Sequence, residues 1–300
     1  MSLSPKRALF VFNPVAGHYR LGRVRGFVEA LRRCGWDVTV RPSQYRGHGA
    51  LIVREALAQR ASDLVIIGGG DGTISECAWE LLDSTVPLAI FPIGSANVLA
   101  RELKIPFNDR HNARMIERVF NDDGAKTIWP GMISTPEGQT LFIQMLGMGP
   151  DGWIVHHVST ALKKHIGRAA YVVSALKCLL SYKFTPFTLN LDGETTEVTA
   201  AILTKGRYYG GKFQLISSSS QEKRSFTALL FRGTDWYDFL KACLSLLLFQ
   251  KKSRFMDVKS ITTASLPPNQ NVDLQSDGDI LASMEAHITI SSRALKVIAP

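Results

Sequence analysis

The sequence predicts an N-terminal α/β domain followed by a C-terminal antiparallel β-sandwich domain. Strand-like and helix-like segments alternate through the first 105 residues, which is typical of a parallel sheet covered by helices on both faces. From about residue 127 alternating β-rich segments with turn signals between them take over, as expected for a sandwich. The chain has 300 residues, 45% of them hydrophobic, which is enough for two domains with a sizeable core.

The N-terminal elements follow from local patterns. The apolar run Ala8–Phe12 predicts a strand that ends at Asn13-Pro14, and the amphipathic stretch 23–34 predicts a helix that ends before Gly35. By the same criteria we expect strands at 36–40, 64–67 and 88–91, and helices at 50–59, from the glycine turn to Leu82, and at 96–103. Strands that are separated by helices in this way run parallel to one another.

In the C-terminal part, β-rich segments cover 132–201 and 213–231, and two helical insertions interrupt the pattern at 159–182 and 236–252. The second insertion, WYDFLKACLSLLLFQKK, has a dense apolar face and ends in two lysines. Helices of this composition also occur at membrane surfaces. We expect it to pack on the sheet, with contact to lipid as the alternative.

Charge and composition limit the classes of partner. The formal net charge of +9 favours an anionic partner, such as a phosphate ligand, an anionic membrane face or nucleic acid. Nucleic acid is not expected, because the chain has neither zinc-finger spacing nor an RNP-type aromatic string. No apolar run reaches the roughly 20 residues that span a bilayer. The four scattered cysteines indicate reduced thiols of a cytosolic protein.

The segment 64–77, LVIIGGGDGTISEC, is the most informative part of the chain. An apolar strand opens through glycines into the start of a helix, and such a turn binds phosphate because bare backbone amides and the helix dipole both favour an anion. Asp71 and Thr73 add an acceptor and a hydroxyl beside the glycines. A plain strand–helix turn that uses glycine only for its conformation is the alternative.

Two more polar or glycine-rich loops follow predicted strands, one beginning at Asn13 and one at Pro92. Ligands of parallel α/β sheets bind at the carboxyl ends of the strands, so we expect the three loops to converge there. Ser95 and Asn97 lie in the third loop, just before a helix. They either contact the ligand or only cap that helix.

The three loops together resemble the catalytic signature of the diacylglycerol kinase superfamily, which includes soluble bacterial lipid kinases, sphingosine kinases and ceramide kinases. The matching motifs are Asn13-Pro14-x-x-Gly17, Gly69-Gly70-Asp71-Gly72-Thr73 and Pro92-x-Gly94-Ser95-x-Asn97-x-x-Ala100-Arg101. Weaker matches follow in the expected order: Gly147-x-Gly149-x-Asp151, Gly167-Arg168-x-x-Tyr171, Tyr209-Gly210-Gly211 and Asp277-Gly278-Asp279. The resemblance covers the chain from Val11 to its end.

The resemblance implies ATP-dependent phosphorylation of a lipid hydroxyl, with Mg²⁺. It implies a nucleotide-binding catalytic domain at 1–127, related to phosphofructokinase and NAD kinase, to which residues 294–300 return, and a lipid-substrate β-sandwich domain at 128–293. A homodimer remains open. The ATP-binding residues implied are Asn13, Pro14, Gly17, Arg23 (with Arg20 as its alternative), Gly69, Gly70, Asp71, Gly72, Thr73, Gly94, Ser95 and Asn97. The metal ligands stay unknown.

By the same resemblance Asp277 is the candidate general base for the acceptor hydroxyl, with Asp279 as its helper and Asp71 as the rival base. The alternative is an ordinary hairpin turn, because Asp-Gly is a common turn dipeptide. The string Asp192-Gly193-Glu194 offers a second match, and only the order along the chain favours Asp277.

The chain departs from the pattern at several points. Val98, Trp129-Pro130 and the string SSSSQEKRS stand where many bacterial relatives carry acidic residues, so we expect the structural magnesium network of some relatives to be absent or built differently. Asp279 replaces a glutamate, and Pro150-Asp151-Gly152 replaces Phe-Asp-Ala.

The leading interpretation is a cytoplasmic kinase that associates with an anionic membrane surface and acts on a diacylglycerol-like or a long-chain-base or ceramide-like acceptor. One alternative is a catalytically weak nucleotide-binding or membrane-associating protein of the same fold. A relative of NAD kinase is the other, but no Asn-Asn-Glu string follows the glycine loop.

Overall fold

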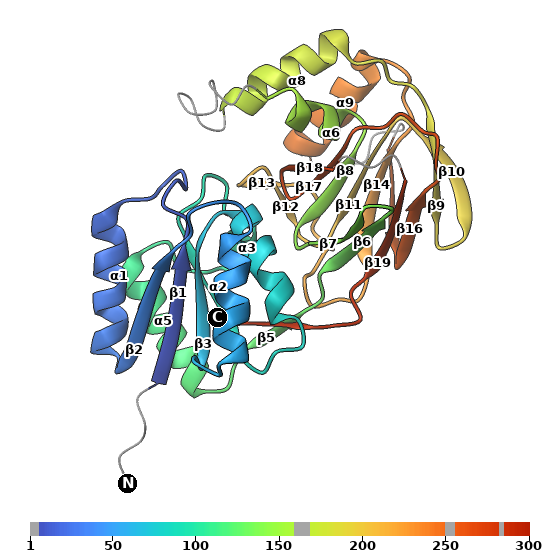
Figure 1. Cartoon of the computed structure of the whole chain (residues 1–300). Coiled ribbons are helices and arrows are strands. Elements are labelled where there is room, and N and C mark those ends of the chain that lie inside the picture. The colour runs from blue at the N-terminus through green and yellow to red at the C-terminus, as the bar shows by residue number, and fades with distance from the viewer. Residues whose placement is uncertain (1–5, 159–168, 250–255, 282–284) are drawn as a thin grey trace. The chain divides into compact units, whose positions relative to one another are not determined.

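The computed structural model describes residues 6–158, 169–249, 256–281 and 285–300. The chain forms two compact units, Met1–Ile128 with Arg293–Pro300 and Trp129–Ser292, called unit 1 and unit 2 below (Figure 1). Part of the predicted insertion at 159–182, the Gly167-Arg168 match and Lys251-Lys252 fall outside the described residues. Among the described helices, none is long and apolar enough to cross a bilayer.

Unit 1 is built on one sheet with the strand order β2-β1-β3-β4-β20-β5. Neighbouring strands run parallel from β2 to β20, and only β5 is antiparallel to its neighbour β20. The last strand of the chain therefore lies in the sheet of unit 1, beside β4. The strands are β1 (Lys6–Phe12), β2 (Trp36–Pro42), β3 (Leu64–Gly69), β4 (Leu88–Pro92), β5 (Lys126–Ile128) and β20 (Leu295–Val297).

Helices pack on both faces of this sheet, with α1 against α5 and α2 against α3 (Figure 1). The helices are α1 (Leu21–Arg33), α2 (His48–Ala58), α3 (Asp71–Ala78), the short 3₁₀ helix η1 (Trp79–Leu81), α4 (Val98–Glu102) and α5 (Asp109–Asn121). Strand β3 is buried along its whole length, as the apolar run predicted. The rings of Phe10, Phe27 and Phe91 contact one another and join β1, α1 and β4 in the core.

Unit 2 is a sandwich of two antiparallel sheets, with strand orders β10-β9-β16-β19-β6-β7 and β15-β14-β11-β8-β17-β18. Leu189 and Ile288 of the first sheet pack with Leu146 and Leu203 of the second in one buried cluster. The strands are β6 (Gly131–Thr135), β7 (Gly138–Phe142), β8 (Met145–Met148), β9 (Phe187–Leu191), β10 (Glu194–Val198), β11 (Ala200–Thr204), β14 (Phe226–Phe231), β15 (Met256–Ile261), β16 (Thr263–Leu266), β17 (Leu274–Ser276), β18 (Asp279–Leu281) and β19 (Ala286–Ile290).

Helices α6 (Pro150–His156), α8 (Ala169–Ser181) and α9 (Trp236–Phe249) and the small hairpin β12 (Tyr208–Tyr209) to β13 (Phe213–Gln214) complete the described part of unit 2. Helix α9 packs through Ala242 and Phe239 on a cluster that contains Phe184 and Phe231. The helix therefore packs as expected along one side, while other side chains of it remain exposed, including Trp236.

Lys205, directly after β11, is fully buried in unit 2. Its ammonium group donates hydrogen bonds to the carbonyl oxygens of Lys223 and Ser225, the second at 3.1 Å. Burial lowers the pKa of Lys205 to about 8, from an ordinary value of 10.5.

This burial predicts a pH dependence of stability. Between pH 8 and 10.5 the unfolded chain binds the Lys205 proton while the folded chain has lost it, so the free energy of unfolding rises with pH, by on the order of 3 kcal/mol across the window. Urea unfolding at a series of pH values should show this rise in the wild type and in the exposed control Lys212→Met. The rise should be absent in Lys205→Met. An unchanged profile in Lys205→Met would contradict the assignment.

Candidate active site

The three predicted loops of unit 1 meet at the carboxyl ends of β1, β3 and β4. The amide of Asn13 donates to the carbonyl of Gly68 (2.8 Å), and the amide of Gly94 donates to that of Gly69 (3.0 Å). His18 completes the contact, because its amide donates to the carbonyl of Ile93 (2.8 Å). Every loop therefore touches another through main-chain hydrogen bonds.

Glycine is required at Gly94, where the second and third loops cross. A Cβ atom there would lie 2.2 Å from Cα of Gly70, which is far shorter than a real contact between such atoms. A Cβ atom at Gly17 would lie 2.3 Å from Oγ of Ser95, so that side chain would have to move. Glycines that read as phosphate ligands in the sequence are thus also needed for the packing of one loop on the next.

Asp71 joins the second loop to the third. Its two carboxylate oxygens accept the amides of Val98 (3.0 Å) and Leu99 (2.9 Å), which are the first residues of α4. Burial raises the pKa of Asp71 above its ordinary value, while the amide donors act in the opposite direction. The side chain is therefore a structural link, in addition to any part in the chemistry.

The first turn of α3 is suited to an anion. The helix begins at Asp71, directly after Gly70, so the residue at its N-cap has no side-chain oxygen to accept the first amides. Thr73 lies in that first turn and is partly exposed. Unpaired amides, the positive end of the helix dipole and a hydroxyl together can hold a phosphate group.

The other predicted ATP ligands divide into two groups. Asn13 and Asn97 shape their own loops, because Oδ1 of Asn13 accepts the amide of Val15 (2.9 Å) and the buried amide group of Asn97 exchanges two hydrogen bonds with Gly94 (2.8 and 2.7 Å). Pro14 and Ser95 lie partly exposed in their loops. Their contacts with a ligand stay predictions.

Arg23 has a partner within unit 1. Its guanidinium pairs with the carboxylate of Asp109 at 2.6 Å and donates to the carbonyl of Phe107 (3.2 Å). This ion pair ties α1 to the start of α5. A role in phosphate binding, still a prediction, requires Arg23 to share its charge with Asp109. Arg20, the alternative, is exposed and donates to the carbonyl of Tyr19 (3.1 Å).

In unit 2, the conserved-looking pattern Gly147-x-Gly149-x-Asp151 has a steric explanation. A Cβ atom at Gly147 would lie 1.7 Å from Oδ2 of Asp151, so only glycine leaves room for that carboxylate. Gly149 has a φ of +81°, which favours glycine, and its amide donates to the carbonyl of Asp273 (2.9 Å). The motif thus places a buried carboxylate against β17.

Asp151 is the centre of a hydrogen-bonded network. It accepts the hydroxyl of Tyr209 and the side-chain amide of Gln275 (2.6 Å). Oε1 of Gln275 in turn accepts the amide of Gly278 (2.8 Å). Burial raises the pKa of Asp151, while the two donors act in the opposite direction. Three separate sequence motifs are therefore connected through Asp151 and Gln275, and the sequence reasoning did not identify Gln275.

Asp277, the candidate base, lies in the hairpin turn between β17 and β18. Asp277 and Gly278 both have positive φ values, +49° and +91°, as a type I′ turn requires. Its carboxylate accepts three consecutive amides, those of Ile143 (2.7 Å), Gln144 (2.9 Å) and Met145 (2.9 Å). Asp279, the predicted helper, is exposed at the start of β18.

The second Asp-Gly string forms the same kind of turn. Asp192 and Gly193 have φ values of +48° and +89°, between β9 and β10. The Asp192 carboxylate accepts the amides of Thr262 (3.0 Å) and Thr263 (2.8 Å). The two turns are therefore close geometric equivalents, and they differ in the motifs that surround them.

Metal binding by protein groups alone is not supported. Among the described residues, no three histidine, cysteine, aspartate or glutamate side chains lie close enough together to hold an ion. Both oxygens of Asp71 accept backbone amides. A magnesium ion in unit 1 would therefore depend largely on the phosphates and on water, which is how Mg²⁺ commonly binds with nucleotides.

Comparison with known proteins places these features in a family. Residues 7–123 match the model of the diacylglycerol kinase catalytic domain. A diacylglycerol kinase of Bacillus subtilis (strain 168) is 28% identical over 241 residues, 79% of this chain and 77% of that protein. A diacylglycerol kinase of Mycobacterium tuberculosis (strain H37Rv) is 25% identical over 295 residues, 96% of this chain and 93% of that protein.

Solved structures agree on the fold. Two crystal structures from Bacillus anthracis str. Sterne match the whole of this chain, with TM-scores of 0.78 and 0.72 at 20% and 18% identity. The matches include 99% and 98% of the two crystallised chains. The second of these is described as a diacylglycerol kinase. At such identities the match concerns the fold alone, and it confirms the predicted α/β plus β-sandwich class.

The matched domain model and the named kinase relatives support a lipid kinase. The comparisons support the resemblance that the loop motifs predicted: residues 7–123 match the diacylglycerol kinase catalytic domain, and the chain is similar to diacylglycerol kinases over most of its length.

The contact between the second and third loops leads to a prediction about ATP binding. Gly94→Ala should weaken ATP binding by at least about tenfold, because the new methyl group overlaps the Gly70 backbone and must separate the loops, at a cost of roughly 1–3 kcal/mol. The matched control is Gly26→Ala on α1, where a Cβ meets nothing within 4 Å and should stabilise the helix by about 0.5–1 kcal/mol. Isothermal titration with ATP measures the affinity of both variants. Equal affinities would exclude the proposed loop contact.

The unit 2 network leads to a second prediction. Gln275→Leu leaves the Gly278 amide and an oxygen of buried Asp151 without a partner, so unit 2 should lose about 1–3 kcal/mol of stability. Gln139→Leu changes an exposed residue of β7 whose side-chain amide donates to Oγ of Ser134 (3.0 Å), and it should change stability by less than about 0.5 kcal/mol. Urea unfolding of the two variants distinguishes a connecting role from a surface one.

Proposed function

We propose that this chain is an ATP-dependent lipid kinase that transfers the γ-phosphoryl group of ATP to a hydroxyl of a diacylglycerol-like or of a long-chain-base or ceramide-like lipid. The proposal rests above all on one observation: three loops from three strand ends of unit 1 converge, and they contact each other where only glycine fits. Phosphoryl transfer depends mainly on positioning and charge neutralisation, and a preformed glycine cradle supplies the first of these.

Backbone groups do most of the nucleotide binding in this proposal. The amides of Gly69 to Thr73 hold the phosphates at the start of α3, and the Thr73 hydroxyl donates one further hydrogen bond. Asp71 keeps the third loop in place through Val98 and Leu99. When bound, magnesium neutralises phosphate charge during the transfer.

Asp277 is the proposed base for the acceptor hydroxyl, with Asp279 two residues away. Three amide donors fix the orientation of the Asp277 carboxylate. Hydrogen bonds that a carboxylate accepts also make it a weaker base. A weak base suffices here, because the phosphoryl transition state is loose and the attacking hydroxyl keeps most of its bond to hydrogen until late.

The reaction requires the enzyme to reach a lipid in a bilayer. We place it at an anionic membrane surface on the cytoplasmic side, as a peripheral protein, because the net charge of +9 favours attraction to anionic lipid. A homodimer is compatible with this arrangement.

The alternative, a catalytically weak nucleotide-binding protein of the same fold, is favoured by one observation. The Asp277 turn has a complete structural explanation in its three amide hydrogen bonds, just as the Asp192 turn has. The two proposals differ in whether Asp277 also acts on an acceptor.

The direct experiment is incubation of the purified chain with labelled ATP, Mg²⁺ and a panel of lipids in mixed micelles. The panel contains diacylglycerol, a long-chain base, ceramide and phosphatidylglycerol. A labelled lipid supports the kinase proposal and identifies the acceptor class. ATP binding without any labelled lipid supports the alternative.

The paired Asp-Gly turns provide a controlled prediction for Asp277. Asp277→Asn should lower kcat by at least about 100-fold while the Kd for ATP stays within about twofold, because asparagine accepts the left-handed turn but removes the charge. Asp192→Asn makes the same change in the equivalent turn and should leave kcat unchanged. Equal losses in both variants would assign Asp277 a purely structural role and move Asp71 forward as the base.

A further inference from the structure

Exposed apolar side chains gather on two helices of unit 2. Leu180 on α8 is 88% exposed, and Trp236 and Tyr237 at the start of α9 are 50% and 51% exposed. Val173 on α8 and Leu244 on α9 are also exposed. The two helices pack against each other, so these side chains belong to one region, called the α8–α9 patch below.

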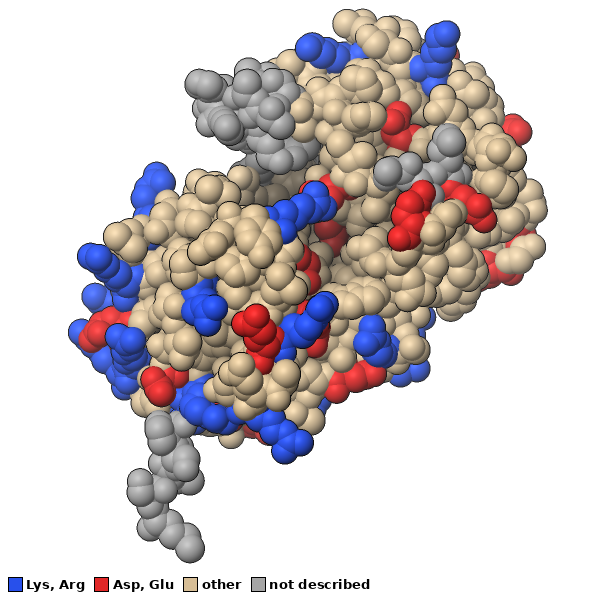
Figure 2. Space-filling view, in the orientation of Figure 1, with Lys and Arg blue, Asp and Glu red and all other residues tan. Residues whose placement is uncertain are grey.

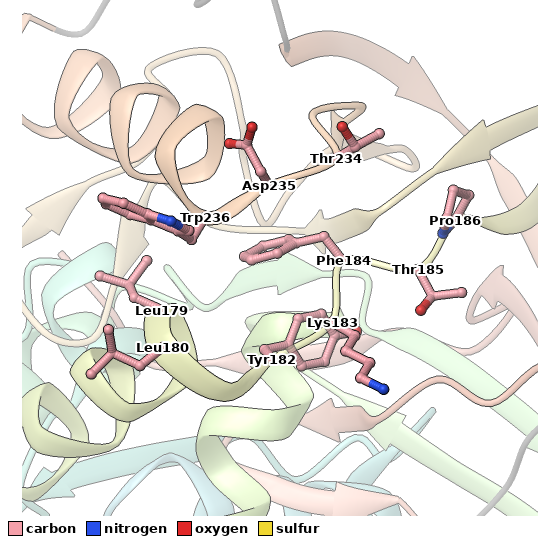
Figure 3. A pocket seen from close by; sticks show the side chains of 10 residues that line it. All are labelled: Leu179, Leu180, Tyr182, Lys183, Phe184, Thr185, Pro186, Thr234, Asp235 and Trp236. Carbon is pink, nitrogen blue, oxygen red and sulfur yellow. The ribbon is translucent and has the colours of Figure 1, made fainter.

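A shallow groove of about 450 Å³ borders this patch, between the end of α8 and the start of α9. Figure 3 shows Leu179, Leu180 and Trp236 on the same side of the groove, with the ring of Phe184 beside them. Phe184 itself is buried in the cluster beneath α9. The patch therefore continues into the core of unit 2 and is not a set of isolated surface residues.

The exposed aromatic side chains of the patch, Trp236 and Tyr237, suit a boundary between an apolar phase and water. Tryptophan and tyrosine are the residues that favour the boundary between an apolar phase and water, because each joins a large ring to one polar group. Lys241 lies over the Tyr237 ring at 3.9 Å from its centroid. A lysine on such a ring can keep its ammonium in water while its stem lies along an apolar phase.

Among the described residues, basic side chains outnumber acidic ones at the patch. Lys177, Lys183 and Lys241 are exposed on or beside the two helices. Figure 2 shows this end of unit 2 mostly in tan with basic side chains at its margin.

The acidic groups at the patch are Asp235 and Asp238. Oδ1 of Asp235 accepts the amide of Asp238 (2.8 Å), so Asp235 serves as the N-cap of α9 and stabilises its positive end. Their position is therefore explained by the helix, and the net charge of the patch stays positive.

We propose that the α8–α9 patch is the surface on which this chain docks to an anionic lipid bilayer, with Leu180, Trp236 and Tyr237 inserted at the headgroup level and Lys183 and Lys241 facing anionic headgroups. An apolar patch with cations beside it matches such a surface, because the apolar side chains meet the acyl chains and the cations meet the anionic headgroups. This proposal rests on the proposed function, which gives the chain a reason to dock on a bilayer. Its test is separate, because binding to a bilayer is measured without nucleotide or acceptor.

The test is co-sedimentation of the full chain with sucrose-loaded vesicles at 0.1 M salt. Vesicles of phosphatidylcholine with 30% phosphatidylglycerol should bind the wild type at least about tenfold more strongly than phosphatidylcholine alone, because each lysine near an anionic surface contributes about a factor of five. Lys183→Gln and Lys241→Gln should each lower the partition coefficient about fivefold. Leu180→Glu should lower it at least about tenfold.

Two controls make the result specific. Leu51→Glu places the same charge on α2 of unit 1, at a side chain that is 40% exposed, and should leave vesicle binding unchanged. Thermal unfolding of Leu180→Glu should match that of the wild type, because the side chain is almost fully exposed. A loss of binding in Leu51→Glu equal to that in Leu180→Glu would overturn the proposal.

The remaining outcomes are also decisive. No preference for anionic vesicles in the wild type overturns the proposal, even if the chain phosphorylates a dispersed short-chain acceptor. A dimer in solution that Leu180→Glu converts to a monomer, without vesicle binding, assigns the patch to a second copy of the chain. Vesicle binding that is lost in Leu180→Glu upholds the docking surface, even if no acceptor is phosphorylated.

Discussion

The candidate nucleotide site depends on a close approach of two backbones, those of Gly70 and Gly94. A methyl group at Gly94 would lie 2.2 Å from Cα of Gly70. Because no side chain separates the loops, the carbonyl of Gly69 can accept two amides of the third loop, those of Ile93 and Gly94. The carboxylate of Asp71 can then cap α4. The loops thus form a single preorganised surface before any nucleotide binds, which reduces the entropy lost on binding.

The same kind of interaction is made by three aspartates in the described part of the chain. Asp71, Asp192 and Asp277 each use a carboxylate to accept at least two backbone amides from a segment distant in sequence. Charged acceptors form stronger hydrogen bonds than neutral ones, so one short side chain can fix the end of a loop. An aspartate in a glycine-rich motif is therefore not by itself a sign of catalysis. In this chain the three must be separated by experiment.

Much of the fold was predictable because its periodic signals are strong. The apolar run of β3 and the alternation of strands and helices before residue 105 gave the sheet of unit 1, and the elements lie within a few residues of the expected bounds. Helix α5 was not predicted. One polar residue, Asn112, lies on its buried face, where the side chain donates to the carbonyl of Ile90 (2.9 Å).

The candidate site was predictable only where function and sequence spacing coincide. Glycine loops can be recognised from the local sequence. Gln275 cannot, because a glutamine within a short β-strand has no distinctive pattern. Its importance arises from two partners, Asp151 and Gly278, of which the first is 124 residues away. Arg23 shows a related limit, because the residue that the sequence suggests as a phosphate ligand pairs with Asp109 in the fold, and its role in binding stays a prediction. Contacts between distant segments are what one sequence without an alignment does not reveal.

The two candidate bases differ in what their removal would disturb. Both oxygens of Asp71 accept amides that position the third loop, and burial raises its pKa. Replacing Asp71 would therefore disturb nucleotide binding and turnover together, and the kinetics would not separate the two effects. Asp277 accepts the amides of Ile143, Gln144 and Met145 in unit 2, in a turn that asparagine can also adopt. Chemistry can be separated from binding only at Asp277, so the assignment of the base depends on that residue.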